Sequence, residues 1–107
     1  MADYTIKAGD AGAAIGAVLA DASGPVDLSG ASVRFLMADA QTGAVKVDAA
    51  ATVTGAGSGA VSHTWAAADL DTAGSYLAEF EVTFGSGEIA TFPSAGWITI
   101  EVVDDLD

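Results

Sequence analysis

The stretch SYLAEFEVTF, residues 75–84, alternates between two kinds of side chain. Side chains of one parity are apolar, and most are large: Tyr76, Ala78, Phe80, Val82 and Phe84. Side chains of the other parity are a serine, a leucine, two glutamates and a threonine. A β-strand points successive side chains to opposite faces, whereas a helix would scatter the aromatic residues and the glutamates around its circumference. The stretch therefore predicts a strand with one buried face and one wet face.

Other stretches show the same alternation with less contrast. The clearer ones are residues 32–37, 60–65 and 97–102, and the weaker ones are residues 4–7, 13–21, 44–48 and 51–54. Glycine-rich turns separate these stretches at spacings of about ten residues, which is typical of sandwiches and barrels. Two glycines weaken the alternative of an alanine-rich helix over residues 11–22. We expect an all-β fold of about seven or eight short strands, with a helical turn only at Thr64–Leu70.

Length and charge limit what the chain can be. The 107 residues suffice for one domain, so we expect a single domain over residues 1–107 with frayed ends at 1–3 and 104–107. Fifteen Asp and Glu against three Lys and Arg give a formal net charge of −12. This charge repels nucleic acid and anionic membranes, so neither is an expected partner. It suits a basic protein partner or divalent cations, or it serves solubility alone.

Three features that the sequence lacks narrow the classes of protein to which the chain could belong. There is no cysteine, no N-terminal signal pattern and no apolar run near the length of about 20 residues that crosses a bilayer. We therefore expect a chain that is made in the cytoplasm and that has neither disulfides nor thiolate metal sites.

Residues that could carry chemistry are few. His63 is the only histidine, and its place between Val61 and Trp65 in a predicted strand favours a packing role. Residues 55–59 are glycine-rich but lack the lysine of a phosphate loop, so we expect a hairpin there. The carboxylates of Asp69, Asp71 and residues 104–107 could supply oxygen ligands for calcium, although the spacing of an EF-hand is missing. We expect no catalytic site, no cofactor and no enzyme activity, with calcium as the one metal left open.

A turn enters the strongest predicted strand at Asp71-Thr72-Ala73-Gly74-Ser75-Tyr76. In immunoglobulin-like sandwiches, a tyrosine at this place hydrogen-bonds back across the corner between the two sheets. The phenol anchors the connection while its ring joins the core. We therefore predict that Asp71, Gly74 and Tyr76 form a structural corner, and that the fold is an immunoglobulin-like antiparallel β-sandwich.

Further segments extend this pattern along the chain. They are Gly9-Asp10, residues 21–35, residues 59–65 and residues 91–100. From about Gly9 to Ile100 the series resembles the N-terminal domain family of phage baseplate upper proteins, which are immunoglobulin-like virion modules. The most specific pieces are the turn at Pro25–Gly30 and the bend at Phe92-Pro93. His63 departs from the family, since an aromatic residue such as tyrosine is expected there.

The resemblance implies a non-enzymatic structural protein of a tailed-phage virion. Such a protein would be located in the virion and would dock either on the capsid, as a decoration protein, or on the tail or baseplate, as an adaptor. Its partners would be other virion proteins, with no nucleic acid, membrane or small-molecule substrate. The alternative is a carbohydrate-binding or adhesin-type module of a bacterial surface protein, for which only Trp97 and Tyr4 could form a sugar platform.

Contact with a partner is expected near the start of the last strand. Trp97 has the opposite parity to the apolar set of residues 98–102, so its side chain should point outward. Phe92 and Pro93 lie in the adjoining bend. Together the three residues predict an apolar docking patch. The alternative is that Trp97 covers one end of the sandwich or packs beneath a loop.

Overall fold

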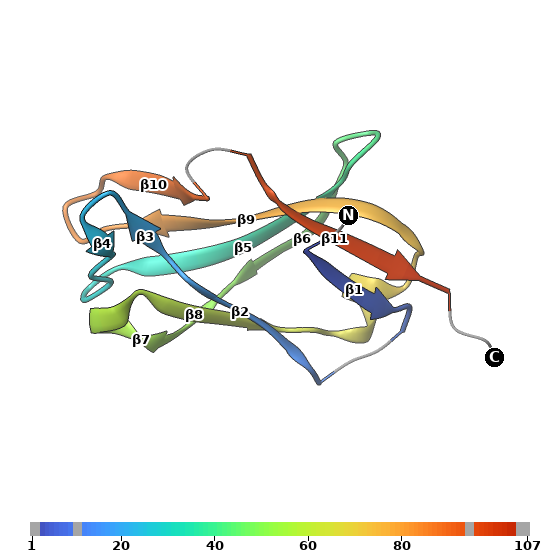
Figure 1. Ribbon diagram of the computed structural model, residues 1–107, viewed down its shortest axis with the longest axis horizontal. Helices are drawn as coiled ribbons and strands as arrows, with labels where there is room; N and C mark the ends of the chain where they lie inside the picture. The colour runs from blue at the N-terminus through green and yellow to red at the C-terminus, as the bar shows by residue number, and fades with distance from the viewer. Residues whose placement is uncertain (1–2, 10–11, 94–95, 105–107) are drawn as a thin grey trace.

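Two β-sheets face each other in the computed structural model, which describes residues 3–9, 12–93 and 96–104 (Figure 1). The larger sheet contains β1 (Tyr4–Lys7), β5 (Ser32–Asp39), β6 (Val45–Ala50), β9 (Gly74–Thr83), β10 (Ile89–Phe92) and β11 (Ile98–Val103). The smaller sheet contains β2 (Ala14–Val18), β7 (Thr52–Gly55) and β8 (Ala60–Thr64). A short hairpin of β3 (Ala20–Asp21) and β4 (Gly24–Pro25) and two 3₁₀ turns, η1 (Ala56–Ser58) and η2 (Ala67–Leu70), complete the described elements.

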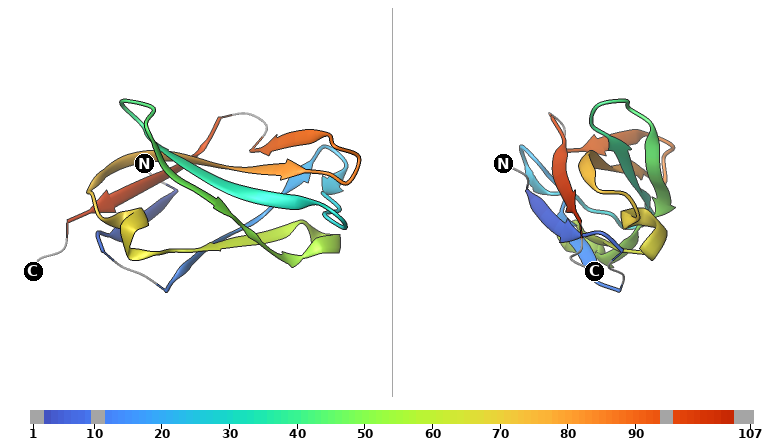
Figure 2. Two further views of the ribbon diagram at one scale, coloured as in Figure 1. Left: turned by 180° about the vertical axis from the view of Figure 1, so that it is seen from behind. Right: turned by 90° about the vertical axis from the view of Figure 1, so that its right-hand side faces the viewer.

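The strand order of the larger sheet is β1-β11-β9-β5-β6. Strand β10 pairs with the second half of β9 and β11 pairs with the first half, while β5 occupies the other side of β9 along its length. The smaller sheet has the order β2-β8-β7. All pairs are antiparallel except β1 with β11. Viewed along the long axis, the two sheets enclose the core between them (Figure 2).

Strand β9 is the centre of the larger sheet, and it has the one buried face that its alternation predicts. Its inward side chains are almost fully buried: Tyr76, Ala78, Phe80 and Val82. They meet inward side chains of the smaller sheet in one continuous core, with Phe35 of β5 facing His63 of β8. The prediction of an all-β sandwich is confirmed.

The described residues contain eleven strands, more than the sequence predicts, because residues 13–21 divide into β2 and β3 and because β4 and β10 form where no strand is expected. Residues 13–21 divide at Leu19, whose N–H donates to Gly59 O while its carbonyl accepts from Val26. Gly59 has a φ of +71°, and a Cβ there would lie 2.4 Å from Leu19 O, so only glycine allows this approach. The hairpin expected at residues 55–59 is confirmed, because they connect the antiparallel strands β7 and β8, and the connection contains η1.

The predictions for the helical turn and for the chain ends agree with the structure only in part. The helical turn expected within Thr64–Leu70 is confirmed as η2, but it is not the only one, since η1 is a second helical turn among the described residues. Asp3, expected to fray, is tied down instead: its N–H donates to Thr99 Oγ1, and its carboxylate accepts from the Thr99 N–H, each at 2.9 Å. Residues 1–2 and 105–107 lie outside the described residues.

None of the helices that the structure describes is long and apolar enough to cross a membrane.

Candidate functional site

The predicted corner forms a tight set of hydrogen bonds. The hydroxyl of Tyr76 donates to Thr72 O at 2.7 Å, while its ring lies in the core. Gly74 has a φ of +154°, a conformation that favours glycine. The Asp71 carboxylate accepts from Lys46 of β6 and from the Thr72 hydroxyl. These bonds tie the corner to the edge of the larger sheet, so its role is structural.

The ion pair at this corner shifts the pKa of both partners. The Lys46 ammonium, helped by the Thr72 hydroxyl, holds the pKa of Asp71 below its ordinary value of 3.8. The same hydrogen bond to Asp71 raises the pKa of Lys46 above 10.5. Both groups are therefore charged across the neutral range.

His63 is a core residue, as its position in the predicted strand indicates. Its ring stacks on Phe35 with centroids 4.6 Å apart and an interplanar angle of 11°. Its Nε2 lies 2.9 Å from Asp69 Oδ2, and the same carboxylate oxygen accepts from the N–H of Ala66, also at 2.9 Å. The imidazole is thus held between the two sheets by an aromatic ring and a carboxylate.

The carboxylates expected to hold calcium are engaged within the protein. Asp69 bonds His63 and the start of η2, and Asp71 bonds Lys46 and Thr72. Asp104 is exposed, while residues 105–107 lie outside the described residues. Within residues 3–9, 12–93 and 96–104, no three His, Cys, Asp or Glu side chains are grouped so that they could hold a metal. Calcium therefore has no support in this part of the chain.

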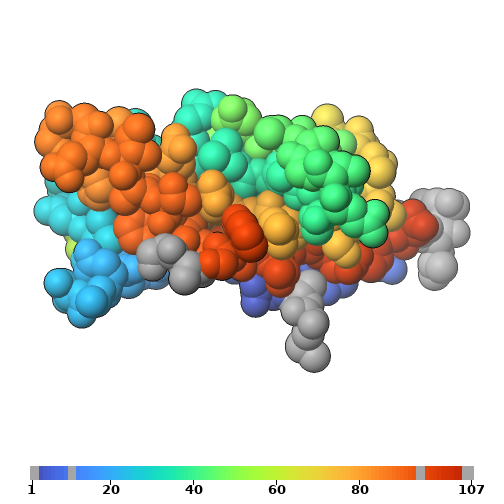
Figure 3. Space-filling model, turned by 90° about the horizontal axis from the view of Figure 1, so that it is seen from above, coloured from blue at the N-terminus to red at the C-terminus, as the bar shows by residue number. Residues whose placement is uncertain are grey.

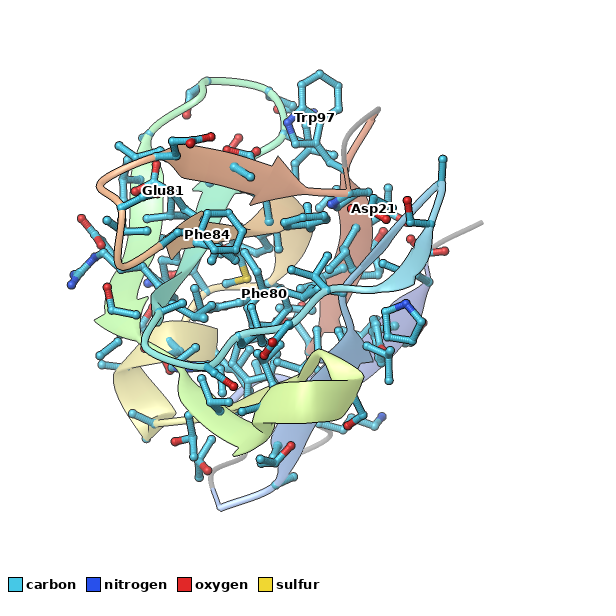
Figure 4. All side chains as sticks on the ribbon, turned by 90° about the vertical axis from the view of Figure 1, so that its left-hand side faces the viewer. Asp21, Phe80, Glu81, Phe84 and Trp97 are labelled. Carbon is cyan, nitrogen blue, oxygen red and sulfur yellow. The ribbon has the colours of Figure 1, made fainter. Side chains whose placement is uncertain are left out.

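The three residues expected to form one apolar patch are divided between two sites. Trp97 is 58% exposed and projects away from the core, whereas Phe80 points into it (Figure 4). The expectation of an exposed Phe92 is wrong, because that residue is only 8% exposed. It ends β10 opposite Phe80, in a register that turns its side chain inward. Phe92 and Pro93 line a hollow beside β2, and Trp97 lines a different one.

The hollow beside Trp97 is a groove of about 350 Å³ on the outer face of the larger sheet. We call it the Trp97 groove. Its lining residues are Leu36, Met37, Ala38, Asp39, Ala40, Gly43, Val45, Leu77, Glu79 and Trp97. From above, the turn that joins β5 to β6 rises on one side of this face and the start of β11 lies on the other (Figure 3). The groove is therefore built from the neighbouring strands β5, β6 and β9, from the turn between β5 and β6, and from Trp97 immediately before β11.

Sheet register puts apolar side chains on a face that should be wet. Ala38 lies opposite Leu77, and Leu36 lies opposite Glu79. Leu36 and Leu77 are therefore diagonal neighbours on the outer face, within reach of each other. Both leucines break the polar parity of their strands, and this was the sequence signal for the groove. Neither residue could be placed beside Trp97 without the pairing of β5 with β9.

A β-bulge completes the groove. On β6, Val47 pairs with Met37, but Val45 rather than Lys46 pairs with Ala38. The extra residue turns Val45, which is 70% exposed, toward the groove. It also lets Lys46 turn toward Asp71 at the corner. Bulges commonly re-aim side chains in this way at functional edges.

The charges around the groove are negative. The guanidinium of Arg34 is engaged by Asp48, with Nε 2.7 Å from Oδ1 and a nitrogen 3.2 Å from the Asp48 carbonyl. The carboxylate of Glu79 has no hydrogen bond or ion pair among the described residues, and it lines the groove together with Asp39. Asp39 accepts the N–H groups of its own turn, and these hold its pKa below the ordinary value. An apolar floor thus carries an acidic rim.

Known proteins that match the chain share its fold rather than its sequence. No family model and no curated protein matches the sequence. Among solved structures, the crystal structure of CopC from Methylosinus trichosporium OB3b is similar, with a TM-score of 0.58 and 18% sequence identity. The match covers 100% of this chain and 89% of that chain. At this identity the two proteins are shown to share a β-sandwich fold.

This comparison corrects the expected function. The prediction of a tailed-phage virion protein, with a sugar-binding or adhesin module as its alternative, is wrong: a solved structure that matches over the whole chain is CopC, which is not a phage protein. The physical reason is that the Tyr76 corner and the Pro25–Gly30 turn are requirements of a sandwich, which many functions share. The family resemblance and the virion location and partners are not tested by the comparisons and stay predictions without support.

Proposed function

We propose that this chain is a non-enzymatic protein-binding domain whose ligand site is the Trp97 groove, and that its partner is a basic protein segment carrying an apolar side chain. One observation carries the proposal: an exposed tryptophan lies beside two outward-facing leucines in a hollow lined by the acidic residues Asp39 and Glu79. Tryptophan is enriched at the energetically dominant positions of protein interfaces.

The size and lining of the Trp97 groove suit an apolar side chain of a partner. A volume of about 350 Å³ is at the lower end of the range for small-ligand sites. The floor formed by Leu36, Leu77 and Val45 offers apolar contact to a bound side chain. Burying a leucine or phenylalanine side chain in such a site stabilises a complex by about 1.5–3 kcal/mol.

Charge complementarity selects the kind of partner. The chain carries a formal net charge of −12, and the groove itself presents Glu79 and Asp39. Complementary potentials speed association and exclude like-charged partners. A segment with lysine or arginine next to its apolar residue is attracted here, whereas an acidic segment is repelled. Association should therefore slow as the salt concentration rises.

Metal binding is the other function to consider for this chain. The likeness to CopC makes copper the first metal to consider for this chain. Cysteine, methionine and histidine are the usual copper ligands, and the chain has no cysteine, two methionines and one histidine. Met37 is buried in the core, and His63 is bonded to Asp69. The described residues do not fit a copper site.

Selection from a random peptide library displayed on yeast tests the proposed function. The folded wild-type chain is the bait, and the Trp97→Ala variant is the matched control. We expect selected peptides to combine an apolar residue with a neighbouring lysine or arginine, and to bind the variant at least about tenfold more weakly. Trp97 is exposed, so the substitution should leave the melting temperature nearly unchanged.

Two results would overturn the proposed function. One is a selection that yields no binding peptide. The other is a set of peptides that bind wild type and Trp97→Ala equally well, since these would contact another surface.

A further inference from the structure

Trp97 and Glu79 both line the groove, and Trp97 comes immediately before β11. Ile98, which follows Trp97, pairs with Ala78, which precedes Glu79 on β9. Because both side chains line the same hollow, they lie on the same outer face. An aromatic ring and a carboxylate are therefore neighbours at one wall of the groove.

An indole beside a carboxylate is suited to a guanidinium group. The flat cation stacks on the ring while its N–H groups donate to the carboxylate in a two-pronged pair. Leu36 lies next to Glu79 on the other side, where it can contact the aliphatic stem of the same side chain. A lysine ammonium meets the charge but not the planar geometry. The chemistry favours arginine.

Cations within the chain are engaged elsewhere on this sheet. Arg34 bonds Asp48, and Lys46 bonds Asp71. These are two of the three basic residues in the sequence. The carboxylate of Glu79, by contrast, has no partner in the part of the chain that the structure describes. It is free to receive a cation from outside.

We infer that Trp97 and Glu79 together form a receptor for one arginine side chain of the partner. This inference rests on the proposed function and makes it more specific: the partner's apolar residue occupies the floor of the Trp97 groove, and its arginine lies between the indole and the carboxylate. Glu79 is then the residue that determines specificity, and Trp97 contributes to both contacts.

Matched peptides and matched variants test the receptor. A peptide selected on the wild-type chain is synthesised with its arginine, with citrulline, which keeps the shape but lacks the charge, and with lysine. Each is titrated against wild type, Glu79→Gln and Glu81→Gln. Glu81 provides the control because it lies on the same face of β9, opposite Arg34, but outside the groove lining.

We expect the citrulline peptide to bind wild type about tenfold more weakly, and lysine to give an intermediate affinity. Glu79→Gln should weaken binding of the arginine peptide by a similar factor. It should weaken binding of the citrulline peptide little further, because Glu79→Gln and the change from arginine to citrulline remove the same interaction. Glu81→Gln should have a much smaller effect. A Trp97→Leu variant, which keeps an apolar side chain but removes the π face, should also reduce the preference for arginine over citrulline.

The inference is wrong if arginine and citrulline peptides bind alike, or if Glu79→Gln and Glu81→Gln weaken binding equally. In either case, binding that still depends on Trp97 would leave the proposed function intact. Loss of the proposed function has a different signature, because Trp97→Ala would then bind the peptides as wild type does.

Discussion

His63 illustrates how one polar side chain is accommodated in an apolar core. Its ring covers Phe35 as an aromatic residue would, and its Nε2 has a partly buried carboxylate partner in Asp69. Burying an imidazole without such a partner would cost the desolvation of its nitrogens. The sequence indicated a packing role for His63, but the partner comes from η2, six positions further along, and depends on the path of that turn.

Replacement of His63 by alanine should therefore strongly destabilise the fold. It would remove a stacked ring from between the sheets and leave Asp69 without its imidazole. We expect the free energy of unfolding to fall by about 2–4 kcal/mol, measured by urea denaturation.

The comparison variant is Asp69→Ala, which keeps the ring in place. It removes one hydrogen bond to His63 and one to the start of η2, so its cost should be smaller, about 1–2 kcal/mol. If His63→Ala cost less than Asp69→Ala, the stacked ring would not be the larger contribution, and this account of the core would fail.

At the scale of the elements, the bulge in β6 and the corner before β9 are connected through Lys46. The bulge in β6 releases Lys46 from the sheet pattern, and Lys46 then reaches Asp71 at the start of the corner. Tyr76 holds the other side of that corner through Thr72. One extra residue on an edge strand thus both shapes the Trp97 groove, through Val45, and fixes the entry of β9.

Acid should weaken the corner. Because the folded-state pKa of Asp71 is lowered, its contribution to stability is present above pH 3.8 and is lost as the pH falls through the lowered value. The raised pKa of Lys46 means that its contribution is present below pH 10.5 and is lost as the pH rises through the folded-state value. Asp71→Asn should therefore lower the melting temperature at neutral pH, with the difference disappearing in strong acid.

Melting temperatures of wild type and Asp71→Asn across the acid range provide the measurement. Asp104→Asn is the control, since that residue is exposed beyond the end of β11. A difference between wild type and Asp71→Asn that stayed constant into strong acid would show that the ion pair does not contribute as described.

A strand could be predicted from the sequence where its own residues alternate clearly between apolar and polar side chains. The stretch at residues 75–84 identified β9 because its two faces differ sharply. The break between β6 and β7 was predicted, since residues 44–48 and 51–54 alternate as separate stretches. The break at Leu19 was not predictable, because it occurs where the chain changes partners along one alternating stretch. Phe92 was misplaced for a related reason: β10 is a separate strand whose register against Phe80 turns that side chain inward.

The candidate site depends on the whole molecule. Parity alone predicted that Trp97 points outward, and it is exposed. Leu36, Leu77 and Val45 come from three other strands, and only the register and the bulge bring them to the same groove. Together with an overall charge of −12, this geometry favours a basic partner at one defined place on the surface.

Mapping of backbone amide chemical shifts by NMR tests that central claim most directly. The wild-type chain is titrated with a peptide selected from the displayed library. We predict that the largest shifts cluster at the Trp97 groove, at Leu36, Leu77, Glu79 and Trp97. Shifts concentrated instead at the second hollow, around Val18 and Phe92, would place the binding surface elsewhere and contradict the account.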